Sequence, residues 1–387
     1  MISKNLFPIS LFACIFFVAQ FLSCASQLVP KEIFYVGTFA DQDSQGLYVF
    51  EFDRSNGELN QIQTVSDREG PSFQAIHPDG NFLYSISGES MDPDSNHGTV
   101  SAYRIDQSTG KLSIINEQSA EGQGACHVSI DPRGRFVYVS NYSEGNLSVY
   151  SINQDGSLEE ASDVVQHEGH GPNENRQNSP HMHSIIPSED GKFIYASDLG
   201  IDKVMIYEVS DSGTLTPAEV PYVENTPGSG PRHFAIHPNG NFAYSAEELS
   251  YTVAAFSVDK RNGALSQIQR VSMLPDDYQN PNNSAADIHF SPDGKYLYAS
   301  NRGHDSIVIY SVDPSTGFLS LSGHEPTRGG HPRNFGVDQK GEYLFVANRD
   351  DNNVVFFNKD NESGLLEYAG IEAIVPKAVC VTQHFLK

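Results

Sequence analysis

Two short phrases recur along the chain, and their numbers differ by one. The first phrase, as in Ala-Ile-His-Pro-Asp-Gly-Asn-Phe-Leu-Tyr at 75–84, predicts a strand, a tight turn and an alternating strand. Its turn glycines lie roughly fifty residues apart, a spacing typical of propeller repeats. These glycines are Gly80, Gly134, Gly191, Gly240, Gly294 and Gly341. The second phrase, Gly-x-Leu, begins another strand and occurs at Gly57, Gly110, Gly156, Gly213, Gly263, Gly317 and Gly364.

The difference between six and seven copies predicts how the ends of the chain meet. The repeated region begins at Ile33 with a second strand that has no first, and it ends after Lys377 with a first strand that has no second. Joining the ends completes a seventh unit, and a closed ring leaves no strand edge exposed. We therefore predict an all-β, seven-bladed β-propeller with four antiparallel strands per blade. Its N- and C-terminal strands share one blade, and residues 33–387 form a single domain.

The first residues predict export. One lysine, the apolar run at 6–22 and the small residues after it are typical of a signal peptide over residues 1–23. Phe-Leu-Ser-Cys at 21–24 resembles a bacterial lipoprotein cleavage site, which makes Cys24 the lipidated first residue of a short linker, 24–32. Plain secretion is the alternative. Either way we expect the cell envelope or periplasm, with membrane contact only through an acyl anchor.

Composition limits the partners. The net charge is −25, no tryptophan is present, and no run of lysine or arginine occurs, so the chain repels nucleic acid and anionic lipid. An anionic ligand therefore requires a local cluster of arginines. Of four cysteines only Cys126 and Cys380 lie in the predicted domain, and either one bridge or two buried thiols fits them. We expect a monomer.

The first strand of each propeller blade lines a central channel. Counting back from the turn proline or its equivalent aligns three histidines, His127, His183 and His233, and the next two copies have Asp287 and Asn334 there. This alignment predicts a polar layer around the channel, with His181 one step nearer its mouth.

The loops after the second strands open on the same face as the loops that precede the first strands. The former carry Asn141, Asp198, Glu247, Glu248, Asn301, Arg302, Asn348 and Arg349, and the latter add Arg232 and Arg333. We expect four arginines, two glutamates and several histidines to converge on one funnel. The candidate substrate contacts are His127, His181, Asp198, His233, Glu247, Asp287, His289, Asn301 and Arg333.

Other interpretations stay open for these residues. The polar layer can be a solvated channel whose members satisfy one another, Asn141 and Asn348 can serve turns, and Arg349 can pair with Asp350. Three aligned histidines suit zinc, but they come from separate blades and lack short ligand spacing. We expect no metal and no cofactor.

Several motifs resemble one protein family. Pro-His-Met-His at 180–183, Gly230-Pro-Arg-His, Glu248-Leu-x-x-Thr-Val and Ser300-Asn-Arg-Gly-His-Asp-Ser-Ile are similar to motifs of the propeller-type lactonases. That family includes bacterial 6-phosphogluconolactonase and the fungal carboxymuconate lactonizing enzyme. The resemblance runs from about Ile33 to the C-terminus. It implies a seven-bladed propeller without a metal, and a catalytic set of His183, Arg232, Glu248 and Arg302.

Lactone opening is chemistry that these residue types can perform. Water must be deprotonated, which a histidine near its ordinary pKa can do, and the carbonyl oxygen must be stabilised as it becomes negative, which guanidinium groups can do. Glu248 can orient a partner or act as an acid, and its neighbour Glu247 competes for that place. We expect hydrolysis of a sugar lactone, 6-phosphogluconolactone or a related aldonolactone. The alternative is a non-catalytic binding propeller of the cell envelope.

Overall fold

The computed structural model describes residues 1–2, 30–40, 43–66, 68–92, 94–280 and 282–387. Contacts divide the chain into Met1–Pro30 and Lys31–Lys387. The predicted signal peptide, Cys24 and most of the linker lie outside the described residues. None of the described segments is a helix long and apolar enough to cross a membrane.

The unit Lys31–Lys387 is built from seven four-stranded antiparallel sheets, here called blades 1 to 7 in chain order. The innermost strands of blades 1 to 7 are β28 (Ala378–Phe385), β4 (Pro71–Ile76), β8 (Ala125–Ile130), β12 (Met182–Pro187), β16 (Pro231–Ile236), β20 (Ser284–Phe290) and β24 (Pro332–Val337). The second strands are β1 (Glu32–Thr38), β5 (Phe82–Ser87), β9 (Phe136–Asn141), β13 (Phe193–Asp198), β17 (Phe242–Glu247), β21 (Tyr296–Arg302) and β25 (Tyr343–Asn348).

The two outer strands of each blade follow in the same order. The third strands are β2 (Leu47–Asp53), β6 (Thr99–Ile105), β10 (Asn146–Ile152), β14 (Lys203–Val209), β18 (Thr252–Val258), β22 (Ser306–Val312) and β26 (Asn353–Lys359). The outermost are β3 (Glu58–Val65), β7 (Leu112–Ser119), β11 (Leu158–Gln166), β15 (Leu215–Glu224), β19 (Leu265–Ser272), β23 (Leu319–Pro326) and β27 (Leu366–Ile374).

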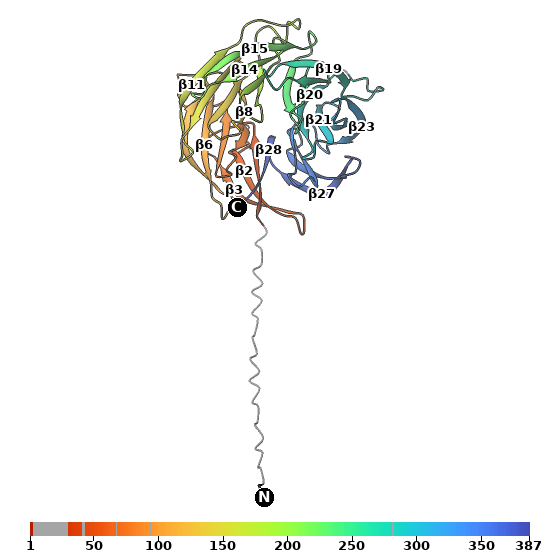
Figure 1. Cartoon of the computed structure of the whole chain (residues 1–387). Coiled ribbons are helices and arrows are strands. Elements are labelled where there is room, and N and C mark those ends of the chain that lie inside the picture. The colour runs from red at the N-terminus through yellow and green to blue at the C-terminus, as the bar shows by residue number, and fades with distance from the viewer. Residues whose placement is uncertain (3–29, 41–42, 67, 93, 281) are drawn as a thin grey trace. The chain divides into compact units, whose positions relative to one another are not determined.

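The blades form a closed ring. Each innermost strand contacts the innermost strands of the two neighbouring blades, and β28 lies between β24 and β4. In Figure 1 the colour passes once around this ring, from the orange strands β2 and β3 to the blue strands β27 and β28. The predicted seven-bladed propeller, and its closure by strands from both ends of the chain, are confirmed.

The closing blade is held by pairing, packing and charge. β1 pairs antiparallel with β28, from Glu32 opposite Phe385 to Thr38 opposite Ala378. Arg54 ties blade 1 to blade 7, because Nε lies 2.5 Å from Glu32 Oε2 and Nη2 lies 2.7 Å from Asp338 Oδ1. The seam is thus sealed by a guanidinium between two buried carboxylates.

The two recurring phrases are partners in space. The tyrosine that ends the first phrase donates its hydroxyl to the carbonyl of the Gly-x-Leu glycine in the next blade, as in Tyr84 to Gly156 (3.0 Å) and Tyr244 to Gly317 (2.7 Å). The same contact joins Tyr35 to Gly110, Tyr195 to Gly263 and Tyr298 to Gly364. Because a buried hydroxyl needs a partner, this bond positions five of the seven blades against the next, whereas the Tyr138 hydroxyl of blade 3 has no hydrogen-bond partner among the described residues.

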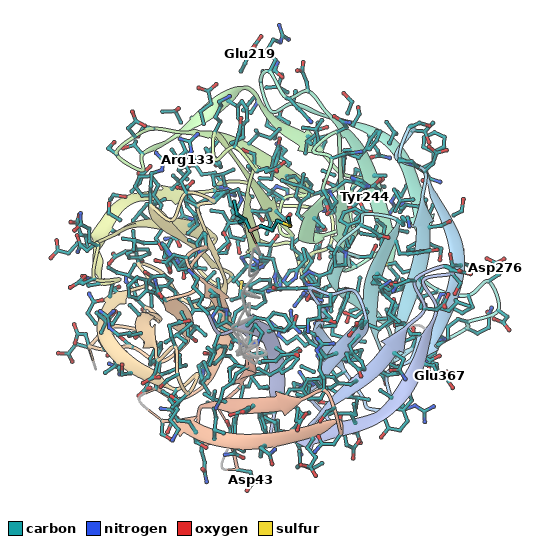
Figure 2. All side chains as sticks on the ribbon, turned by 60° about the horizontal axis from the view of Figure 1, so that its bottom comes forward. Asp43, Arg133, Glu219, Tyr244, Asp276 and Glu367 are labelled. Atoms are coloured by element: carbon teal, nitrogen blue, oxygen red, sulfur yellow. The ribbon has the colours of Figure 1, made fainter. Side chains whose placement is uncertain are left out.

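Apolar side chains fill the spaces between blades. The blade 7 and blade 1 boundary contains Phe34, whose ring lies 4.9 Å from that of Phe345, and Tyr244 lies within the ring in Figure 2. The negative charge lies outside: Asp43, Glu219, Asp276 and Glu367 are exposed on the outer edge. The repeat therefore separates the apolar spaces between blades from an acidic outer surface.

Candidate active site

The innermost strands carry an irregularity near their start. Register is lost between Pro71 and Phe73, between Ala125 and His127, and at the corresponding places in the other blades. In blades 2, 3, 4, 5 and 7 the residues left unpaired are Ser72, Cys126, His183, Arg232 and Arg333. In blade 1 the unpaired residue is Val379, and in blade 6 Ala286 and Asp287 are unpaired. A bulge of this kind re-aims a side chain. The bulge residues thus form one layer around the funnel.

A second layer comes from the residue directly after the polar residue near the end of the second strand of a blade. Tyr142 follows Asn141, Glu248 follows Glu247, and Arg302 follows Asn301. Tyr142, Glu248 and Arg302 line the same pocket as four of the bulge residues, whereas Arg232 is fully buried, does not line the pocket, and contacts it only through Glu248.

The pocket occupies about 690 Å³ at the funnel end of the channel. All seven blades contribute residues to its wall, and blade 5 contributes Glu248. Its lining residues are Phe39, Ala40, Glu69, Gly70, Ser72, Gly88, Glu89, Gly124, Ala125, Cys126, Tyr142, Ser143, Arg176, His183, Glu248, Arg302 and Arg333. A cavity of this size suits a small molecule.

Glu248 is the electrostatic centre of the pocket. Its Oε2 lies 2.9 Å from Arg232 Nε and 2.8 Å from Arg302 Nη2, and Arg176 Nη2 donates to Oε1 (2.5 Å). Burial raises the pKa of Glu248, but the Arg302, Arg232 and Arg176 cations outweigh burial and hold the pKa well below its usual value. Glu248 is therefore a carboxylate that orients guanidiniums and cannot serve as an acid at neutral pH.

The guanidiniums are crowded. Burial, with the Arg302 and Arg333 cations, lowers the pKa of Arg232 well below its ordinary value. Burial and Arg302 likewise lower the pKa of Arg333 to about 10. Because a guanidinium stays charged in a protein, this crowding favours any negative charge that develops beside it.

Two glutamates line the opposite wall. Glu69 and Glu89 belong to loops of blade 2, and the Glu69 amide donates to Glu89 Oε2 (2.9 Å). Blade 2 lies three blades from blade 5 in one direction and three from blade 6 in the other. The pocket is thus polarised, with guanidiniums facing carboxylates across it.

His183 contributes a neutral imidazole. Its side chain is buried, and its ring centroid lies 5.5 Å from that of Tyr142, whose hydroxyl accepts from Arg176 (3.4 Å). Burial and the Arg232, His233 and Arg333 charges lower the pKa of His183 well below 6.5. The expectation of an ordinary pKa is corrected here: the ring is neutral throughout the physiological range, and Nδ1 is buried without a hydrogen-bond partner.

The predicted alignment of three histidines is also corrected. Ser184 pairs with Ser197 as His127 pairs with Ser140 and His233 with Ala246. Ser184 therefore corresponds to the two other histidines, and His183 is the bulge residue. This one-residue offset turns His183 into the funnel.

The remaining channel residues lie deeper. His127, His233, Asp287 and His289 line a separate cavity of about 260 Å³, further along the inner strands than the funnel pocket. Asp287 contacts two of the histidines, since Oδ1 lies 2.6 Å from His233 Nδ1 and Oδ2 lies 2.9 Å from His289 Nε2. The structure does not place these four candidates on the funnel wall. Within the described ranges no group of three His, Cys, Asp or Glu side chains is arranged to hold a metal.

Three further candidates have a different role. Asp198 accepts from the His181 and Gly200 amides, and Asn301 donates to the Met273 carbonyl. Glu247 accepts from Arg270 Nε (2.6 Å). All three are fully buried strand-end residues that anchor loops, and none lines the pocket.

The structural interpretation, in which a residue anchors a loop or pairs with a neighbour, also fits two asparagines and one arginine. Asn141 and Asn348 donate to the Ala120 and Thr327 carbonyls, and Arg349 Nε pairs with Asp350 Oδ1 at 2.7 Å. His181 stacks on Tyr142 with ring centroids 4.4 Å apart, outside the lining. Cys126 and Cys380 are free thiols.

The sequence analysis did not predict four polar residues of the pocket wall, namely Glu69, Glu89, Tyr142 and Arg176. Arg176 lies in the long loop between β11 and β12, and Tyr142 directly follows the strand-end Asn141. The signal for Tyr142 was its position, which matches that of Glu248 and Arg302. Arg176 is the one basic residue in its loop, but no periodicity indicated where that loop folds.

A closed propeller with a charged, partly open pocket of this size suits an enzyme that acts on a small molecule. Residues 33–383 match the family described as lactonase, 7-bladed beta-propeller. The chain therefore belongs to the seven-bladed lactonase family, and it is a lactone-hydrolysing enzyme.

Named relatives agree with this assignment. The 6-phosphogluconolactonase of Formosa agariphila is 37% identical over 310 residues, which cover 79% of this chain and 86% of the relative. That of Bacillus subtilis is 37% identical over 310 residues, covering 80% and 86%. The periplasmic gluconolactonase of Pseudomonas aeruginosa superposes with a TM-score of 0.86 at 30% identity, covering 92% of this chain and 100% of the other.

Proposed function

We propose that the funnel pocket hydrolyses a sugar lactone of the aldonolactone type. The observation that carries this proposal is that Glu248 forms ion pairs with three guanidiniums and lines the same pocket as the neutral His183. A lactone ring placed there meets a base, a set of cations and the carboxylates of the far wall. Named relatives that act on gluconolactones support this substrate class.

The polarity of the pocket orients the ring. Arg302 and Arg176 face the side where the carbonyl oxygen gains charge, and Glu69 and Glu89 accept hydrogen bonds from sugar hydroxyls on the other side. The wall carries equal numbers of arginines and glutamates, so their formal charges cancel over the whole pocket. A neutral sugar ring fits that arrangement.

The steps of the reaction follow from these positions. His183 takes a proton from water as the oxygen of that water bonds to the lactone carbonyl carbon, and the carbonyl oxygen becomes an oxyanion beside the guanidiniums. The ring C–O bond then breaks, and the leaving alkoxide takes the proton from His183. The product is a hydroxy acid, whose carboxylate the arginines stabilise. A neutral His183 is the form that this first step requires.

The test is a pH-stat assay of glucono-1,5-lactone, its 6-phosphate and galactono-1,4-lactone, with buffer hydrolysis subtracted. We expect turnover of at least one sugar lactone, insensitive to a chelator, and a loss of about 100-fold or more in kcat/KM for His183→Ala. Hydrolysis of none of them, with binding retained, would instead favour the non-catalytic binding propeller.

We also propose that the mature protein is a monomer held at the cell envelope through Cys24. The sequence Phe-Leu-Ser-Cys at 21–24 and the likeness to a periplasmic gluconolactonase support export. Labelled palmitate should enter the wild-type protein and not Cys24→Ala, which should be released from membranes. Light scattering on the soluble domain checks the assembly state. Labelling of Cys24→Ala, or a dimeric mass, contradicts the respective claim.

A further inference from the structure

Five blades have a left-handed residue just before the innermost strand, and two of these five residues carry a side chain. The residue just before the innermost strand is Gly70, Gly124 or Gly230 in blades 2, 3 and 5, with φ of 60°, 72° and 65°. In blade 1 it is Lys377, with φ of 52°, and in blade 7 it is His331, with φ of 60°. A side chain in this left-handed region costs about 1–2 kcal/mol relative to glycine. Such a cost at His331, whose side chain borders a cavity, points to a role for that side chain.

The surroundings of His331 leave room for that side chain. A Cβ on Gly230 meets Leu249 Cγ at 2.7 Å, and one on Gly124 meets Ser143 Oγ at 2.5 Å. The equivalent neighbour in blade 7 is Asp350, whose Oδ2 lies 3.9 Å from His331 Nδ1. Where blades 3 and 5 have a glycine packed tightly against its neighbour, blade 7 thus has an imidazole beside a carboxylate.

His331 borders a second cavity beside the catalytic pocket. This cavity occupies about 370 Å³ and shares Arg302 with the pocket of Glu248. Its other lining residues are Asn282, Asn283, Ser284, Gly303, Asp305, His331 and Asp350. His331 Nε2 is buried without a hydrogen-bond partner. Burial and the Arg302 and Arg349 cations lower the pKa of His331 to about 3, so the ring is neutral, with one donor and one acceptor.

The lining identifies the chemistry of an occupant. Amide, hydroxyl and imidazole groups supply both donors and acceptors, as a polyhydroxylated ligand requires. Asp305 and Asp350 offset Arg302, so the cavity has no excess positive charge for a second anion. Asp305 is itself engaged, because its Oδ1 accepts from the Gly303 and His331 amides and fixes both loops.

We propose that this cavity is a second subsite, which binds a neutral glycosyl unit attached to the lactone ring held by the catalytic pocket. The preferred substrate is then the lactone of a disaccharide aldonic acid. This inference rests on the proposed sugar-lactone hydrolysis and extends its substrate class.

The experiment compares kcat/KM of the full-length protein for glucono-1,5-lactone and for the lactones of maltobionic, cellobionic, lactobionic and melibionic acids. We expect at least one disaccharide lactone to exceed gluconolactone about tenfold. His331→Gly introduces the residue that blades 2, 3 and 5 have at this position, and glycine suits the left-handed backbone, so the fold should be unharmed. In that variant the ratio of disaccharide to monosaccharide kcat/KM should fall about tenfold.

A matched control lies three residues away. Arg328 also has a left-handed backbone, with φ of 57°, but its guanidinium covers the Tyr368 ring at 4.6 Å and lines neither cavity. Arg328→Gly should leave the ratio unchanged. A wild-type protein without preference for any disaccharide lactone, or a ratio that His331→Gly does not lower, overturns the subsite.

Failure of the subsite can be told from failure of the proposed function. Turnover of gluconolactone without a disaccharide preference removes the subsite alone. If no lactone is hydrolysed, calorimetry with lactobionate, maltobionate and gluconate decides, because binding needs no turnover. Tighter binding of a disaccharide acid that His331→Gly weakens supports the subsite, and equal binding refutes it.

Discussion

Glu247 and Glu248 are neighbours in the chain, yet their carboxylates lie on opposite sides of one strand end. Glu248 Oε2 lies 2.8 Å from Arg302 in the pocket, whereas Glu247 Oε2 accepts from Arg270 (2.6 Å) outside it. Successive side chains of an extended segment alternate in direction, which accounts for the separation. Of the two adjacent acids, Glu248 therefore faces the pocket and Glu247 anchors the strand end.

Replacement of Glu248 by glutamine should impair both activity and stability. The variant keeps the shape but leaves Arg176, Arg232 and Arg302 without their shared carboxylate. We expect kcat/KM to fall about 100-fold or more and the unfolding free energy to fall by about 3 kcal/mol. Lactone assays and urea unfolding measure the two effects.

Glu247→Gln is the matched control. It should lower the urea midpoint while kcat/KM, measured well below the transition, stays within about threefold of wild type. A larger loss of activity in Glu247→Gln than in Glu248→Gln would reverse the assignment of the two acids.

The acid limb of the pH–rate profile should reflect His183. The base acts when neutral, and the pKa of the folded enzyme lies well below 6.5. Activity should therefore persist as the pH falls through 6.5 and decline only at lower pH. Profiles of kcat/KM from pH 4.5 to 8 test this, and half-maximal activity at or above pH 6.5 contradicts it.

Stability should fall in acid because of the channel histidines. Burial lowers the pKa of His127 and His183 well below 6.5 and that of His233 to about 4. Between the folded and unfolded pKa values only the unfolded chain binds the proton, so each histidine costs up to about 1.4 kcal/mol per pH unit below 6.5. His289, whose pKa is raised, acts in the opposite direction. Urea unfolding at pH 7, 6 and 5 should show a falling midpoint, and a midpoint that rises in acid refutes the interpretation.

The closure of the ring should depend on Arg54. Arg54→Ala leaves Glu32 and Asp338, both buried, without their shared cation. We expect a loss of about 3 kcal/mol in unfolding free energy, with activity retained at low temperature. Arg68→Ala removes the pair with Glu117 inside blade 2 (2.7 Å), which is more exposed, and should cost about 1 kcal/mol or less. Equal losses in the two variants would remove the special role of the seam.

Cys126 should resist alkylation although it lines the pocket. Burial raises the pKa of its thiol to about 12, so the reactive thiolate is scarce at neutral pH. Iodoacetamide at pH 7.5 should leave activity intact for hours, and labelling should appear after denaturation. Rapid inactivation that Cys126→Ser abolishes would show an activated thiol instead.

The repeat phrases alone determined the ring. Six copies of one phrase and seven of the other could be reconciled only by sharing a blade between the chain ends, and β1 does pair with β28. Turn glycines and alternating strands are local properties of the sequence, so they can be predicted without knowledge of tertiary contacts. The family motifs also placed His183, Arg232, Glu248 and Arg302 among the candidates.

Only the tertiary structure decided which polar side chains face the pocket. A bulge shifts the register by one residue, and such a shift moves a side chain to another face without any change in composition. That shift separated His183 from His127 and His233, which an alignment on the turn proline had equated. Arg176 reached Glu248 through a loop with no period, because loop paths depend on long-range contacts rather than on local pattern.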